Sequence, residues 1–264
     1  MSDLPKIPEF PILSSRENVE EIDCNKFAKA LQEIYEHPNV LEVDYSQIKE
    51  IPAFVSSELN YALKKMKNRR GADKSKIVVE MIKFGSPLLH QKLLETYNDI
   101  LSEGKVPENW HITIFTMLPK SGDLKNVSNW RPIAILPILY KVFAKMLYYR
   151  LSPILELQQA DDQFGFRRNK RIDDVFVILE NMIGKSDEWN LPLWMISLDL
   201  RKAFDRINFQ PLFNALREQK VPEAYIQLLS ALYEKQQGCV NGSYLFPIKR
   251  GVKQSDILSA MLFI

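Results

Sequence analysis

Apolar and polar residues alternate along most of this chain with the period of an α-helix. Phe27, Ala30, Leu31 and Ile34 recur at helical spacing and predict a helix over residues 25–36. Ser86 followed by Pro87 is typical of a capped helix start, and that helix should end near Gly104. The same reasoning predicts further helices over 56–69, 76–84, 139–151, from 173 or 174 through 183, 209–219, 222–235 and 255–264.

Strand signals are few. The β-branched, alternating run His111–Leu118 predicts one strand, and the apolar run before Asp199 predicts a buried strand over 193–199. Asn241-Gly242 lies between two short apolar runs and indicates a hairpin. The expected fold is therefore α/β (α+β), predominantly helical with a small antiparallel sheet.

Composition narrows the class of protein. With 264 residues, 46% hydrophobic and 26% charged, the chain can bury a sizeable core. Its two cysteines, Cys24 and Cys239, lie far apart and do not indicate a disulfide framework or a zinc site, which fits a reducing intracellular setting. The N-terminus lacks the apolar core of a signal peptide. The most apolar stretch, 133–149, is interrupted by a proline and two lysines, so no membrane span is expected.

Two cations flank the loop that follows the first predicted strand. Lys120 comes just after the strand, and Arg131 precedes a proline that fixes the backbone. An ammonium and a guanidinium on one loop suit a polyanion such as a triphosphate. The alternative is that both are ordinary loop charges.

The segment QFGFRRNKR, residues 163–171, interleaves aromatic rings with cations. Rings stack on bases while neighbouring cations meet phosphates, so the segment suits a single-stranded template. A solvated charge run beside two buried phenylalanines is an equal alternative. The residues concerned are Phe164, Phe166, Arg167, Arg168, Lys170 and Arg171.

A carboxylate at the tip of a buried strand is a natural ligand for a hard divalent cation, which makes Asp199 a candidate magnesium ligand. It could instead cap the segment that follows. For Asp205, a cap or a pair with Arg206 is the preferred interpretation. Gln254 follows a flexible glycine turn and could reach a sugar or a base edge, although helix capping by Ser255 or Asp256 explains the same turn.

Four sequence blocks, taken together and in their order along the chain, are more specific for a function than any one of these motifs. LPKSGDLKNVSNWRPIAILPILYKVFAKMLYYRL, QFGFRRNKRIDDVFVILE, LWMISLDLRKAFDRI and GVKQSDILSAMLF closely resemble the reverse transcriptase domain of non-LTR (LINE-type) retrotransposons. NYALKKMKNRRGADKSKIVVEMIK is similar to that family's lead-in segment, so the resemblance covers roughly residues 60–264.

The resemblance implies the fingers and partial palm of a right-hand polymerase. It implies a lead-in with a helix over 1–55, a fingers-like part over 56–190 and a partial palm over 191–264. The activity implied is RNA-directed DNA polymerase, with an RNA template, a DNA primer and dNTPs as partners, Mg²⁺ as cofactor and no membrane.

By the same resemblance, specific residues receive roles. Asp199 is the catalytic metal-binding aspartate, and Leu200 adds its backbone carbonyl. Phe204 packs under the sugar and Gln254 positions the nucleotide. Lys120 and Arg131 contact the triphosphate, while the template lies along Phe166, Arg167 and Arg168.

The sequence also departs from the family pattern. The family's aromatic-Ala-Asp-Asp hairpin follows the glutamine block, and this chain ends at Ile264 before it, so we expect the fragment to be inactive alone. Ser255 stands where relatives usually carry glycine. The alternative function is a non-catalytic, nucleic-acid-binding remnant that uses KKMKNRR, residues 64–70, and the GFRR segment. An intracellular, nuclear location is expected; oligomeric state is not predicted.

Overall fold

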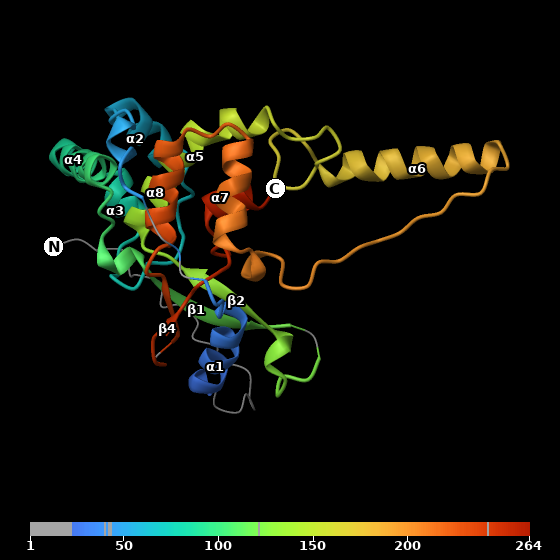
Figure 1. Ribbon diagram of the computed structural model, residues 1–264, viewed down its shortest axis with the longest axis horizontal. Helices are drawn as coiled ribbons and strands as arrows, with labels where there is room; N and C mark the ends of the chain where they lie inside the picture. Colours follow the sequence, from blue (N-terminus) through green and yellow to red (C-terminus); the bar gives the residue numbers. More distant parts are fainter. Residues whose placement is uncertain (1–22, 40, 42–43, 121, 242) are drawn as a thin grey trace, which may run out of the picture.

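The computed structural model describes residues 23–39, 41, 44–120, 122–241 and 243–264, and its one described sheet lies below a layer of helices in Figure 1. The strand order is β2-β1-β3-β4. β1 is antiparallel to β2 and parallel to β3, and β3 is antiparallel to β4. The expected fold class is confirmed, but the sheet is mixed rather than antiparallel throughout. The strands are β1 Ile112–Pro119, β2 Trp130–Ile135, β3 Gln237–Val240 and β4 Phe246–Pro247.

The helices follow the predicted order closely, with the largest differences at three C-terminal ends, one of which is that of α6, which continues past residue 183 to Glu188. α2 ends at Lys64, earlier than expected. α5 continues past Leu151 and through Pro153, because its buried face continues to Leu155. The helices are α1 Cys24–Tyr35, α2 Ser56–Lys64, α3 Val79–Lys83, α4 Pro87–Glu103, α5 Ile138–Glu156, α6 Ile172–Glu188, α7 Phe209–Glu218, α8 Glu223–Tyr233 and α9 Ile257–Phe263.

The predicted caps and the hairpin have direct counterparts. The Ser86 hydroxyl accepts a hydrogen bond from the Leu89 N–H, and Gly104 ends α4 in a left-handed conformation at φ 69°. β3 and β4 pair as the hairpin signal predicts, but the paired residues nearest the turn are Gly238 and Phe246, so the connection is longer than two residues. Gly242 of the predicted turn lies outside the described residues.

The sheet is covered on one face by α1. Side chains at odd-numbered positions of β1 point to this face, where Tyr35 stacks on Phe115 with ring centroids 5.6 Å apart. Phe27 meets Trp130 of β2 edge-on at 5.2 Å. β2 was not predicted as a strand because it contains Pro132, which cannot donate to a ladder; its position at the sheet edge accommodates the proline.

The core centres on α5 and an aromatic cluster around it. Phe143 contacts Tyr97 and Trp110, each with ring centroids 5.3 Å away, and Trp110 meets Tyr140 edge-on at 5.5 Å. The Tyr97 hydroxyl donates to the Leu139 carbonyl at 2.7 Å, so its one polar atom is satisfied. Burying each such side chain stabilises the fold by about 1.5–3 kcal/mol.

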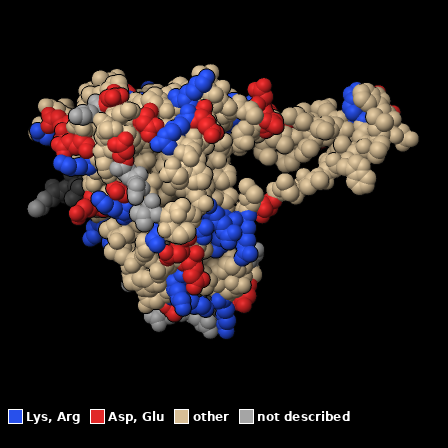
Figure 2. All heavy atoms as spheres, in the orientation of Figure 1, with Lys and Arg blue, Asp and Glu red and all other residues tan. Residues whose placement is uncertain are grey.

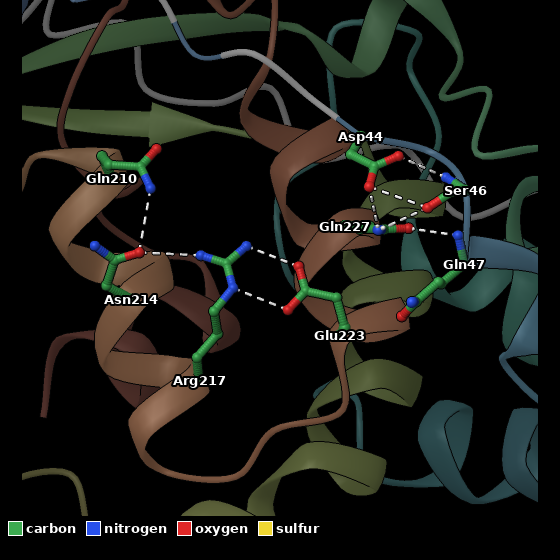
Figure 3. A network of polar contacts seen from close by, with 8 residues as sticks. All are labelled: Asp44, Ser46, Gln47, Gln210, Asn214, Arg217, Glu223 and Gln227. Atoms are coloured by element: carbon green, nitrogen blue, oxygen red, sulfur yellow. Dashed lines mark hydrogen bonds and ion pairs between the residues drawn. The ribbon is translucent and has the colours of Figure 1, made fainter.

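Polar contacts fix the corner between α7 and α8 and attach the chain around residue 45 to it (Figure 3). The Arg217 guanidinium donates two hydrogen bonds to Glu223, at 2.7 and 2.9 Å. The buried amide of Gln227 accepts from the Gln47 N–H at 2.8 Å and donates to Asp44 at 3.1 Å. The segment around residues 44–47 is therefore held against α8, and we call the part of the fold that includes the sheet and the helices packed with it the body.

The extended segment, residues 191–200, and α6 differ from everything above. Figure 1 shows α6 projecting from the body and this segment returning from the far end of α6 to the body. α6 has no buried residue, and Trp194, Ile196 and Leu198 are 90%, 86% and 87% exposed. The predicted strand over 193–199 is therefore wrong. No described strand offers this apolar run a ladder, and unpaired backbone groups remain with water.

Two further sequence expectations concern the whole chain. Cys24 and Cys239 are both free thiols. None of the described helices is long and apolar enough to cross a membrane.

Candidate functional site

Residues 204–207, which follow the extended segment, lie against residues 251–254, which are distant in the sequence. The Gly251 N–H donates to the Ile207 carbonyl at 2.7 Å, and the Val252 N–H donates to the Phe204 carbonyl at 2.8 Å. These bonds hold the short 3₁₀ helix η4, Phe204–Arg206, beside the turn that carries Gln254.

Glycine is required at this junction. Gly251 has φ +91°, and a Cβ there would lie 2.8 Å from the Asp205 carbonyl oxygen and 2.9 Å from the Tyr35 ring. The backbones of Gly251 and Asp205 can therefore approach this closely only because glycine has no side chain.

Asp205 is the centre of this junction. The residue is 3% exposed, and its carboxylate accepts hydrogen bonds from the Tyr35 hydroxyl at 2.8 Å and from the Gln254 amide at 3.1 and 3.2 Å. Burial raises the pKa of the Asp205 carboxyl, and the two donors together with Lys202 and Lys120 oppose that rise. Asp205 thus bonds to side chains distant in sequence, and the interpretation as a cap or a partner of Arg206 missed both.

Basic side chains crowd around Asp205. Half-buried Lys202 has a lowered pKa because burial disfavours its charge; Asp205 opposes this, while nearby Arg201, Arg206 and Lys120 lower it further. Figure 2 shows Lys and Arg atoms concentrated where the extended segment meets the body. We call Lys120, Arg201, Lys202 and Arg206 the basic cluster. Of these, the sequence singled out Lys120 alone.

Arg131 and Lys120 lie on the same hairpin. Arg131 pairs with Leu118 in the β1–β2 ladder, and the Lys120 N–H donates to the Asn129 carbonyl at 2.7 Å, which continues the ladder. Cross-strand partners share a face, and residues two apart on one strand also share it. The exposed side chains of Lys120 and Arg131 therefore both lie on the face of the hairpin that α1 does not cover.

The turn around Gln254 is tied down on both sides. Ser255 has φ +85° and its hydroxyl donates to the Ala134 carbonyl at 2.6 Å. This left-handed conformation is the one that favours the glycine of the family pattern. Asp256 caps α9 through the Leu258 N–H, as the capping interpretation predicted, and accepts from the Tyr140 hydroxyl at 2.6 Å.

Lys253 lies beneath the same turn. Its side chain is 7% exposed, and its ammonium donates to the Trp110 carbonyl at 3.3 Å and sits 4.5 Å from the Tyr140 ring centroid. Burial lowers the pKa of Lys253 to about 8, and Asp256 opposes the shift. This lysine is held inside the body and does not belong to the basic cluster.

The candidate sugar-contacting residue and the candidate template segment are neighbours. The partly buried Phe204 ring stacks on the Phe263 ring, with centroids 4.5 Å apart. The Phe166 ring meets the Phe204 ring edge-on, with centroids 5.8 Å apart. Phe166 itself is 64% exposed. The structure therefore brings the GFRR segment next to η4.

The two arginines of that segment have different surroundings. Arg167 is folded back, donating to Glu156 at 3.0 Å and to the Ala160 carbonyl at 2.6 Å. Arg168 is exposed. Lys170 is also engaged, bonding the Asp161 carbonyl at 3.0 Å. Only part of the predicted template-binding set is presented to solvent.

Asp199 and Leu200 lie at the end of the extended segment, both exposed. The described residues contain no group of three or more His, Cys, Asp or Glu side chains that could hold a metal ion. Asp199 is therefore not part of such a group among the described residues. Mg²⁺ commonly takes one or two carboxylates and completes its shell with water and substrate phosphates, so these two residues fit part of such a shell.

Residues 118–264 match the family described as reverse transcriptase (RNA-dependent DNA polymerase). An uncharacterized 149 kDa protein of transposon TX1 from Xenopus laevis is 28% identical over 211 residues, 78% of this chain and 16% of that protein. The Pol polyprotein of the type-1 retrotransposable element R2 from Popillia japonica is 34% identical over 171 residues, 62% of this chain and 23% of that protein. The RNA-directed DNA polymerase of the mobile element jockey from Drosophila melanogaster is 27% identical over 179 residues, 66% of this chain and 20% of that protein.

The chain therefore spans between 16% and 23% of the length of these three relatives. The family match covers all four sequence blocks, and the relatives are proteins of mobile elements. The chain belongs to the reverse transcriptase family, as a reverse transcriptase domain of the non-LTR, LINE-type retrotransposons.

Proposed function

We propose that the junction around η4 and Gln254 binds the incoming nucleoside triphosphate in RNA-directed DNA synthesis. The observation that carries this proposal is the basic cluster beside a half-buried amide and an aromatic ring, all on segments within the family match. Asp205 brings one negative charge to the four cations of the basic cluster, so a polyphosphate would supply further negative charge, and the aromatic ring and amide suit a sugar and base.

The chemistry agrees with this arrangement. Phosphoryl transfer depends mainly on positioning and on neutralising charge. Lys120, Arg131 and Lys202 would bind the phosphates, Phe204 would pack under the sugar, and Gln254 would orient the nucleotide. Each of these roles belongs to the proposal.

Asp199 and the Leu200 carbonyl would hold Mg²⁺ together with the phosphates. When bound, the metal would supply charge neutralisation at the reacting phosphate. Because Asp199 belongs to no group of three or more ligating side chains among the described residues, we expect metal binding to require the triphosphate as well.

A nucleic-acid strand would lie along Phe166 and Arg168, with an RNA template and a DNA primer as the proposed partners. We assign Arg167 to the support of this segment, since its guanidinium is already engaged. A nuclear location is proposed from the exposed basic run 64–70 and would be tested by imaging the chain with these residues neutralised.

Calorimetric titration of the chain with a dNTP and Mg²⁺ tests the proposal. Lys120→Ala and Arg131→Ala should each weaken binding by about tenfold, equivalent to about 1.4 kcal/mol. Lys105→Ala is the matched control, because Lys105 is exposed and forms an ion pair with the nearby Glu103. Absence of dNTP binding, or equal binding by all three variants, would overturn the proposal.

The alternative of a non-catalytic nucleic-acid-binding protein rests on the exposed cations at 64–70 and at Arg168. RNA binding that weakens steeply with salt, without dNTP binding, would favour it. Primer extension on an RNA template with dNTPs and magnesium then measures whether the chain itself catalyses synthesis.

A further inference from the structure

The Gln254 amide is oriented by its buried partner. A carboxamide has one donating end and one accepting end, and an ionised carboxylate only accepts. The Gln254 Nε2 lies 3.1 and 3.2 Å from the two Asp205 oxygens, so the donating end faces the carboxylate. The opposite orientation would put oxygen against oxygen. The Oε1 end is therefore the end left for a ligand.

Asp205 is itself held firmly enough to impose this orientation. It is buried, its backbone carbonyl lies against Gly251, and its Oδ1 accepts a hydrogen bond from the Tyr35 hydroxyl. Rotating the carboxylate would break this hydrogen bond in a site closed to water, where an unpaired polar group is costly.

Tyr35 comes from α1, which precedes the residues of the family match. It stacks on Phe115 of β1 while its hydroxyl reaches Asp205. The chain of contacts thus runs from the sheet through Tyr35 and Asp205 to Gln254, and the lead-in helix contributes to the site.

We infer that Asp205, held by Tyr35, is a positioning residue that turns the Gln254 carboxamide so that its Oε1 accepts a hydrogen bond from the nucleotide. This inference rests on the proposed function of the site. It assigns the ligand a hydroxyl or amino donor at this point, and it makes Tyr35 act through Asp205 and Gln254.

The orientation can be measured without a ligand. In ¹⁵N-labelled protein, the assigned side-chain NH₂ signals of Gln254 should move on Asp205→Asn and on Tyr35→Phe. Tyr45→Phe is the matched control, since the Tyr45 hydroxyl bonds another carboxylate, Glu234, at 2.6 Å on the exposed surface. Gln254 signals that stay in place in both variants would overturn the inference.

The functional half is tested by a double-mutant cycle on dNTP affinity with Mg²⁺. In the Gln254 chain, Tyr35→Phe should weaken binding about three- to tenfold. In a Gln254→Met chain the same change should have no further effect, which a merely structural role would not produce. Equal weakening in both backgrounds, or none in either, would overturn the inference.

The two proposals fail in different ways. A wild-type chain that binds no dNTP removes the proposed function, while the Gln254 amide signals still decide the orientation. Thermal unfolding identifies any variant that does not fold; Tyr35→Phe deletes a single oxygen, so it carries the test if Asp205→Asn fails to fold.

Discussion

Residues 191–200 and residues 201–207 are consecutive in the sequence but differ in whether they pack against the rest of the protein. The first segment is rich in apolar residues and lies extended in solvent, whereas the second packs against the turn of residues 251–254. The second segment has partners for its backbone at Gly251 and Val252 and for its side chains at Tyr35 and Gln254. An apolar pattern indicates what a segment can bury, and a partner decides whether it is buried.

Two glycines sharpen this comparison most strongly. Gly251→Ala should cost about 2–5 kcal/mol, because it adds left-handed strain and overpacks the Asp205 backbone. Gly184→Ala in α6 meets nothing within 4 Å and should stabilise the helix by up to about 1 kcal/mol. Urea unfolding measures both. A Gly251→Ala chain as stable as wild type would contradict the described junction.

Two leucines make the same comparison between α5 and the extended segment. Leu147→Ala should lower the free energy of unfolding by about 2–5 kcal/mol, since Leu147 is fully buried. Leu198→Ala should change it by no more than about 0.5 kcal/mol. If the two losses were similar in denaturant titrations, the extended segment would be packed in solution.

Lys253 should give the buried side of the junction a pH dependence. The folded chain holds this lysine with a pKa of about 8, and an unfolded lysine titrates near pKa 10.4. Between these values the unfolded chain binds more protons, so the free energy of unfolding should rise with pH, by on the order of 1–3 kcal/mol. Lys253→Met should lose this rise. A wild-type-minus-variant difference that is flat from pH 7 to about 10 would contradict the described burial.

Arg167 and Arg168 distinguish a residue that stabilises the fold from one that contacts nucleic acid, and the changes expected in stability and in RNA binding are the smallest of those predicted here. Arg167→Ala should cost about 1 kcal/mol of stability by breaking its bonds to Glu156 and Ala160. Arg168→Ala should leave stability unchanged and reduce the salt dependence of RNA binding by about one phosphate contact. Thermal unfolding and RNA titration at several salt concentrations check both, and the reverse pattern would sink the assignment.

Local signals explain what the sequence could predict. α4 was predicted at both ends because Ser86 and Gly104 are caps whose effect is local. β2 was missed because Pro132 argues against a strand until its edge position is known. The family blocks predicted Lys120 and Gln254 as site residues, and these predictions still await a ligand measurement.

Long-range partners explain what the sequence could not predict. Tyr35 and Asp205 are 170 positions apart, and no periodicity links them. The one available signal was an acid between Phe204 and Ile207, two apolar residues that both pack against the core. Arg167 was similarly ambiguous, since a cation that pairs with Glu156 and one that meets phosphate look alike in a sequence.

The location of nucleotide binding tests the account most directly. Backbone amide signals of the ¹⁵N-labelled chain should be followed as a dNTP and Mg²⁺ are added. The account predicts shifts concentrated in residues 118–131, 201–207 and 251–256, where the basic cluster, η4 and Gln254 lie. Shifts confined to other parts of the chain, or no shifts at saturating dNTP, would contradict it.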